Sequence, residues 1–148
     1  MTVYIFTETS KSFISTDNLK SKWIESILLV LGKKVDNVEN FSLSVQECRH
    51  SLERVNSIIK GILPELEPIG QNIGRKVNLF LFNKEYTFIP TSKSGHKLMN
   101  YYSIKLLLED AIKNNVNLKV IFASGDNNIP EPIIEKIDNI AKNTTPPE

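Results

Sequence analysis

The stretch KVNLFLFNKEYTFIPTSKSGHKLMNYYSIKLLLEDAIKNNVNLKVIFAS, residues 76–124, decides the fold class. Its first seven residues carry apolar side chains on both faces, which is typical of a strand buried on two sides. Residues 83–90 pair back onto this strand through a tight turn, and a helical segment over residues 98–115 leads to a strand over residues 117–124. A strand, a helix and a second strand in that order predict a parallel pair with a right-handed crossover.

The sequence before this stretch predicts one strand and two helices. TVYIFTE, residues 2–8, is the strand, and Asp17 is a suitable N-cap for a helix that Gly32 ends. The second helix starts with a capping box, Ser44–Glu47, and ends before Pro64. A short helix follows the last strand, so the expected order is β-α-α-β-β-α-β-α.

This order predicts a single α/β or α+β domain over residues 1–142. Its mixed four-stranded sheet would contain the β-hairpin and one right-handed parallel crossover. Residues 143–148 are expected to form a frayed tail. At 148 residues, the chain can bury roughly two thirds of its unfolded surface.

The second helix carries a narrow apolar seam in steps of three and four residues. Trp23 and Leu28 of the first helix are also expected to be inside. The only cysteine of the chain lies on the seam, so we expect a buried thiol without a nucleophilic role. The seam consists of Val45, Cys48, Leu52, Val55, Ile59 and Ile62.

Composition excludes several classes of protein. A single cysteine rules out an internal disulfide, and neither His50 nor His96 has a cysteine or a second histidine at ligand spacing, so no metal site is expected. The net charge of +1 gives no electrostatic argument for a dedicated nucleic-acid binder. No signal peptide or membrane span is recognisable, and the sequence predicts a cytoplasmic protein.

Charge is distributed unevenly along the chain. Residues 75–105 hold six basic residues and one acid, Glu85, whereas residues 106–148 hold seven acids and four lysines. Within the positive part, the loop Thr91–Lys97 precedes a helix, where free backbone N–H groups and the helix dipole favour an anion. The competing interpretation is an ordinary capped helix start with solvated lysines. The candidate partner- or anion-binding residues are Arg75, Lys76, Lys84, Lys93, Ser94, His96 and Lys97.

A second hypothesis concerns the edge of the sheet. If the strands that end near Glu8, Pro90 and Ser124 are parallel, the loops that follow them share one edge, where open α/β folds bind ligands. Polar side chains would then converge there, and the alternative is three unrelated polar turns. The residues concerned are Glu8, Lys11, Lys93, His96, Ser124 and Asp126.

The aromatic residues of the hairpin allow two interpretations. Phe80, Phe82, Tyr86 and Phe88 interleave with lysines, which can bind single-stranded nucleic acid by stacking. They also fall at strand spacing, which favours core or cross-strand packing, and we prefer this second interpretation.

The element order, helix pair, hairpin, helix, strand and helix, resembles an abbreviated acetyltransferase of the GNAT family. FIPTSKSGHKL, residues 88–98, lies where that family has its pyrophosphate-binding turn, although only Gly95 of the glycine pattern is present and one strand is missing. The resemblance covers about half of the chain and implies binding of coenzyme A at this turn.

Two functions from different classes follow. The first is a non-enzymatic, cytoplasmic protein-binding domain of the small inhibitor or immunity type, which neutralises a protein partner through a charged surface. It is favoured because no catalytic residue pattern is found, and no cofactor is expected. The alternative is an anion- or nucleotide-binding α/β enzyme or sensor that uses the shared loop edge, with an acyltransferase-like protein as one form of it. A protein partner is expected, a small anionic ligand stays open, and nucleic acid and membrane partners are not expected.

Overall fold

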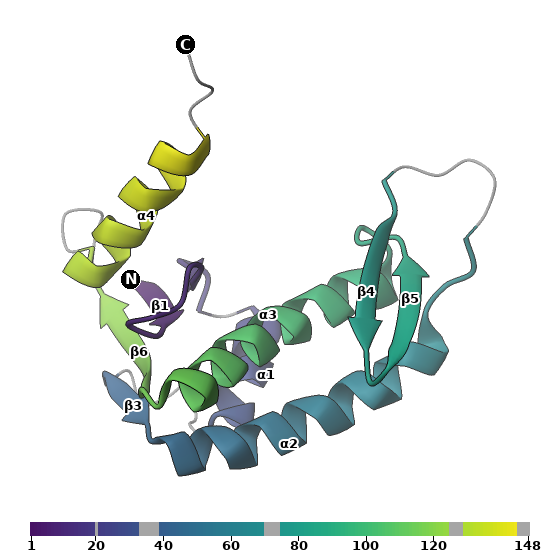
Figure 1. Cartoon of the computed structure of the whole chain (residues 1–148), viewed down its shortest axis with the longest axis horizontal. Helices are drawn as coiled ribbons and strands as arrows, with labels where there is room; N and C mark the ends of the chain where they lie inside the picture. Colours follow the sequence, from purple (N-terminus) through teal and green to yellow (C-terminus); the bar gives the residue numbers. More distant parts are fainter. Residues whose placement is uncertain (20, 33–38, 70–74, 125–128, 145–148) are drawn as a thin grey trace.

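A four-stranded sheet at one end and a β-hairpin at the other are joined by two long helices that run in opposite directions (Figure 1). The computed structural model describes residues 1–19, 21–32, 39–69, 75–124 and 129–144. The elements are β1 (Thr2–Phe6), β2 (Ile14–Thr16), α1 (Lys22–Val30), β3 (Phe41–Leu43), α2 (Val45–Ile62), η1 (Leu63–Glu65), β4 (Val77–Leu81), β5 (Lys84–Phe88), α3 (Lys93–Asn114), β6 (Leu118–Ala123) and α4 (Glu131–Thr144). The mixed α/β class is confirmed, and the order of the expected elements broadly agrees.

The larger sheet has the strand order β2-β1-β6-β3, and all three of its pairings are antiparallel. Val3 lies opposite Phe122 and Phe6 opposite Lys119, so β1 and β6 point in opposite directions. On its other side β6 pairs with β3, where Phe41 lies opposite Val120. Both sides of β6 are therefore occupied.

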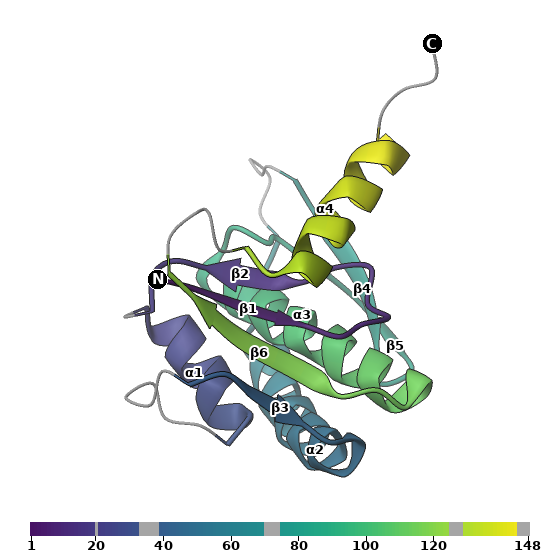
Figure 2. The ribbon, with the colours of Figure 1, turned by 90° about the vertical axis from the view of Figure 1, so that its left-hand side faces the viewer.

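Alternate residues of β1 enter two separate hydrophobic clusters. Val3 and Ile5 belong to the main core, which contains residues of α1, α2 and α3. Tyr4 and Phe6 point the other way and belong to a smaller cluster with Ile133 of α4. The sheet thus has three helices on one face and α4 on the other (Figure 2).

Local signals account for the helix boundaries. The Ser44 side chain accepts a hydrogen bond from the Glu47 N–H, and the Glu47 carboxylate accepts one from the Ser44 N–H, so the predicted capping box is confirmed. Gly32, with φ of +88°, follows the end of α1, as predicted. The N-cap of α1 is Ser21 rather than Asp17. Residues 14–16 form strand β2, and the helix begins only after the chain has left this strand.

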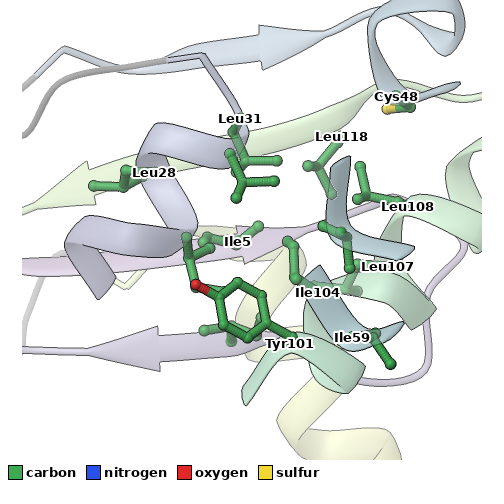
Figure 3. Packing of buried hydrophobic residues seen from close by; sticks show 14 of the residues in the cluster. Ile5, Leu28, Leu31, Cys48, Ile59, Tyr101, Ile104, Leu107, Leu108 and Leu118 are labelled. Carbon is green, nitrogen blue, oxygen red and sulfur yellow. The ribbon is translucent and has the colours of Figure 1, made fainter. Parts of the chain in front are cut away.

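The main core gathers around the facing sides of α2 and α3 (Figure 3). Four seam residues of α2 are buried, whereas Val45 and Leu52 are half-buried. Trp23 of α1 is also half-buried, and it packs against the core together with Leu52. Burial raises the pKa of the Cys48 thiol, which keeps this group neutral. The buried seam residues are Cys48, Val55, Ile59 and Ile62.

The predicted pairing of the strands is wrong in two respects. The hairpin β4–β5 forms a sheet of its own, and no parallel pairing occurs among the described strands, so the predicted crossover within one sheet is absent from them. The physical reason is that β1 and β3 already occupy both sides of β6. The short strands β2 and β3, of three residues each, were not predicted.

Helix α4 ends at Thr144, two residues into the expected tail. Residues 145–148 lie outside the described residues.

Candidate functional site

The hairpin β4–β5 crosses α2 and α3 at the end remote from the four-stranded sheet (Figure 1). Leu81 pairs with Lys84, so only Phe82 and Asn83 form the turn. Their φ angles are +53° and +63°, which identifies a type I′ turn. The inner face of the hairpin packs on the main core through Leu81 and Phe88.

The outer face of the hairpin is open to solvent. Phe80 is 70% exposed and lies opposite Glu85. Beside it, the Thr87 hydroxyl donates a hydrogen bond to the Asn78 side chain, so the centre of this face is an aromatic ring framed by polar groups. The prediction of a strand buried on both sides is wrong for β4, because no described element covers this face. Of the predicted core or cross-strand packing, the core position is wrong for Phe80, which lies across from Glu85. It holds for Phe88, which is 1% exposed, and Tyr86 is half-buried against the core.

The predicted basic residues divide between the two ends of the hairpin. Arg75 and Lys76 are exposed just before β4, at the end where Val77 pairs with Phe88. Lys93, His96 and Lys97 are exposed in the first turns of α3, which follows β5 at the same end. Lys84 lies at the other end of the hairpin. It is four residues before Phe88 in β5, so the two residues are about 13 Å apart along the strand.

Most of the loop Thr91–Lys97, predicted to bind an anion, is the first turn of α3, with Ser92 as its N-cap. The Ser92 hydroxyl accepts a hydrogen bond from the Gly95 N–H at 3.0 Å and donates one to the Ile89 carbonyl at 2.8 Å. Ser94 is half-buried, and its hydroxyl accepts a hydrogen bond from the Glu67 N–H at 3.2 Å. This side chain therefore ties the segment after α2 to α3 and is not an open ligand-binding group.

Two lysines that were not among the predicted site residues join Lys84 at the turn. Lys60 of α2 and Lys105 of α3 place their ammonium groups 4.8 and 5.1 Å from the centre of the Phe82 ring. Lys84 lies over Tyr86, at 5.5 Å from its ring centre. Because these lysines come from three elements, no spacing along the chain could have revealed the group.

The predicted convergence of three loops at one sheet edge is wrong. Thr2 lies opposite Ala123 and Phe6 opposite Lys119, so Glu8 and Ser124 follow opposite ends of the antiparallel pair. The hairpin, and with it the loop after Pro90, belongs to another sheet. Asp126 lies outside the described residues.

Instead, the loop after β1 forms a polar cluster with α3 and α4. The Asp110 carboxylate of α3 accepts hydrogen bonds from the hydroxyls of Thr7 and Thr9. The ammonium group of Lys136 in α4 donates to the Ser10 carbonyl at 2.6 Å. A pocket of about 590 Å³ lies beside it, lined by Glu8, Thr9, Ser10, Lys11, Pro132, Glu135, Lys136 and Asn139.

Glu8, Asp110 and Lys136 of this cluster each have a hydrogen-bond partner. Glu8 pairs with Lys119 at 2.9 Å, and the hydrogen bond and charge of that lysine lower the pKa of the Glu8 carboxyl. Lys136 is only 7% exposed, and burial lowers its pKa although Asp110, Glu135 and Glu8 act in the opposite direction. We interpret the cluster as the contact that fixes α4 against the loop.

The lowered pKa of Lys136 predicts a pH dependence of stability. Between that pKa and its usual value of 10.5, the unfolded chain binds more protons at this position than the native protein. The free energy of unfolding should therefore gain a contribution that rises with pH across this window. Urea unfolding at pH 7 and pH 10 should show this rise to be smaller in Lys136→Met than in the wild type. Equal pH dependence in the two proteins would contradict the prediction.

Within the described residues, no group of three or more His, Cys, Asp or Glu side chains is placed to hold a metal ion. None of the helices in the described ranges is both long and apolar enough to span a membrane. No protein-family model, curated protein or solved structure matches this chain. The acetyltransferase resemblance thus gains no support from these comparisons, and the hairpin before α3 does not belong to the main sheet.

Proposed function

We propose that this protein is a small, non-enzymatic binding domain of the inhibitor or immunity type, which neutralises an acidic protein partner in the cytoplasm. The observation that carries the proposal is the outer face of the hairpin β4–β5. Phe80 is 70% exposed on this face, basic groups stand at the end where β4 begins, and Lys84 is exposed just after the turn, on the side of Leu81 and Tyr86. Exposed aromatic anchors surrounded by polar groups are typical of the energetic centres of protein interfaces.

Charge indicates the chemistry of the partner. Arg75, Lys76, Lys93 and Lys97 are exposed at one end of the hairpin, and Lys84 is exposed at the other. Glu85 is the only acid in the hairpin strands. Such a surface accelerates association with an acidic one and disfavours basic proteins.

The hairpin also has the mechanical properties of a recognition element. Its inner face is anchored by the buried side chains of Leu81 and Phe88, so the outer face is presented on a preorganised scaffold. Preorganisation lowers the entropy cost of binding. The alternative function, an enzyme or sensor at a shared loop edge, loses its geometric basis because that edge is not formed.

The proposal predicts that a protein from the native host binds the wild-type domain through Phe80. Immobilised wild-type protein should capture an acidic partner that Phe80→Ser does not retain, because the apolar anchor is lost. Leu106→Ser is the matched control, since Leu106 is also exposed but lies on α3 beside the loop after β1. Capture that is equal for the wild type and Phe80→Ser would contradict the proposal.

The charge contribution is measured with the purified partner. Lys93→Glu combined with Lys97→Glu should slow association at least about tenfold at low salt, and less at high salt because of screening. Calorimetry of the wild-type protein with phosphate, nucleotides and coenzyme A tests the alternative. If the wild type binds one of these ligands with micromolar affinity and the Lys93→Glu/Lys97→Glu variant does not bind it, the protein is better explained as an anion-binding enzyme.

A further inference from the structure

Three lysine ammonium groups surround two aromatic rings at the turn of the hairpin. Lys60 and Lys105 lie over Phe82, and Lys84 lies over Tyr86, all at 4.8–5.5 Å from the ring centres. The ammonium of Lys105 is 2.7 Å from the Asn56 side-chain oxygen and 3.9 Å from the Glu109 carboxylate. With only 12% of its side chain exposed, Lys105 is a positive charge held in place inside the group.

Among the described residues, Lys60 and Lys84 have no such neutralising partner. Both are exposed, and no carboxylate within the described ranges comes within 4.0 Å of either ammonium group. An aromatic ring attracts a cation by its quadrupole but carries no net charge, so it leaves these two charges uncompensated. The turn end of the hairpin can therefore accept an anion.

Phe82 occupies a backbone conformation that a bulky residue rarely adopts. Its φ of +53° is a position where type I′ turns favour Asn, Asp or Gly. The ring nevertheless stays partly exposed, at 37%, between the lysines of two helices. Backbone conformations of this kind concentrate at ligand-binding sites, where the surrounding contacts maintain them.

A pocket of about 360 Å³ opens between this turn and the end of α2. Its apolar lining can accept methylene groups, and its lysines can accept a negative charge. The C-terminal end of α2 lies at the pocket, and its partial negative charge opposes a doubly charged phosphate more than a single carboxylate. The lining residues are Lys60, Leu63, Pro64, Phe82, Lys84 and Tyr86.

We propose that this lysine–aromatic pocket receives one glutamate side chain of the acidic protein partner. The inference rests on the proposed function and specifies where the partner's carboxylate binds. Its methylene groups would lie against Leu63 and the rings of Phe82 and Tyr86, with the carboxylate between Lys60 and Lys84. The two ammonium groups would attract the same carboxylate, so their charge interactions with it add together.

The first test uses a probe that does not depend on the partner. Titration of the full chain with N-acetylglutamate N-methylamide should shift the ring signals of Phe82 and Tyr86 in NMR spectra and reach saturation. Lys60→Gln with Lys84→Gln should raise the dissociation constant at least about tenfold. Lys22→Gln with Lys113→Gln is the matched control, because both residues are exposed and lie outside the hairpin.

Three outcomes would overturn the inference. They are an absence of shifts at the two rings, equal binding by Lys60→Gln/Lys84→Gln and the wild type, or tighter binding of inorganic phosphate than of the glutamate probe.

The captured partner provides the second test and separates this inference from the proposed function. If Phe80→Ser loses the partner while Lys60→Gln/Lys84→Gln binds it as the wild type does, the pocket assignment is wrong and the proposed function stands. If the probe binds in the pocket but no partner depends on Phe80, the pocket is an anion site and the proposed function is wrong. If the partner dissociates at least about tenfold faster from Lys60→Gln/Lys84→Gln, and at the wild-type rate from Lys22→Gln/Lys113→Gln, the result supports both the pocket assignment and the proposed function.

Discussion

Replacing Gly95 with alanine is expected to lower the free energy of unfolding by about 2–4 kcal/mol, from overpacking together with a disturbed helix cap. A Cβ atom at this position would lie 1.9 Å from the Ile89 carbonyl oxygen and 2.8 Å from the Ser92 hydroxyl oxygen. The first of these atoms is backbone and cannot rotate away. The start of α3 would have to move away from Ile89 to make room for the Cβ atom. This movement would separate the Gly95 N–H from the Ser92 side chain that caps α3.

Gly61→Ala is the matched control in another helix. Apart from the neighbouring backbone of α2 itself, no atom lies within 4 Å of an added Cβ at Gly61, so alanine should stabilise α2 by about 0.5–1 kcal/mol through its higher helix propensity. Chemical denaturation of both variants measures the difference. A Gly95→Ala protein as stable as the wild type would show that α3 does not start against Ile89 in this way.

Shortening Ile59 to alanine is the second change with a large expected effect. Its side chain is fully buried on the seam between α2 and α3, and the variant should lose about 2–5 kcal/mol through the transfer term and the cavity left behind. The thermal midpoint and the urea midpoint should both fall.

Two leucine variants test whether the loss of stability follows the burial of the replaced side chain. Leu52→Ala should cost less than Ile59→Ala because Leu52 is half-buried at the rim of the core. Leu106→Ala, at a residue that is 44% exposed, should change the free energy of unfolding by less than about 1 kcal/mol. A cost for Leu106→Ala that equals the cost for Ile59→Ala would contradict the assignment of the core.

The proposed binding surface lies at the opposite end of the molecule from the polar cluster at Lys136 (Figure 1). Phe80, Lys60 and Lys84 are exposed and are not part of the buried core. Substitutions there should therefore change binding with little effect on folding, whereas Gly95 and Ile59 affect the scaffold on which the hairpin rests.

Several features of the fold could be predicted from the sequence because their physical causes are local. The capping box at Ser44 needs two side chains three residues apart, and the stop at Gly32 needs one residue that tolerates a positive φ. The apolar seam of α2 and the tight turn before Lys84 depend on spacing within one or two elements. Each of these patterns can be recognised from residues that are close together in the sequence.

Tertiary structure decided the arrangement of the strands and the composition of the site. A strand can pair only along a side that no other strand occupies. The short strands that begin at Ile14 and Phe41 occupy the outer sides of β1 and β6, and neither short strand has a clear pattern in the sequence. The hairpin then packs on α2 and α3, which leaves Phe80 exposed although its spacing is that of a buried strand residue.

The basic surface shows the same division between local and long-range causes. Composition showed that residues 75–105 are positive, and Lys84 was among the candidates on that ground alone. Its grouping with Lys60 and Lys105 requires the antiparallel packing of two helices and the turn that places Phe82 between them. Charge is a property of the residues themselves, whereas convergence arises only when distant segments pack together.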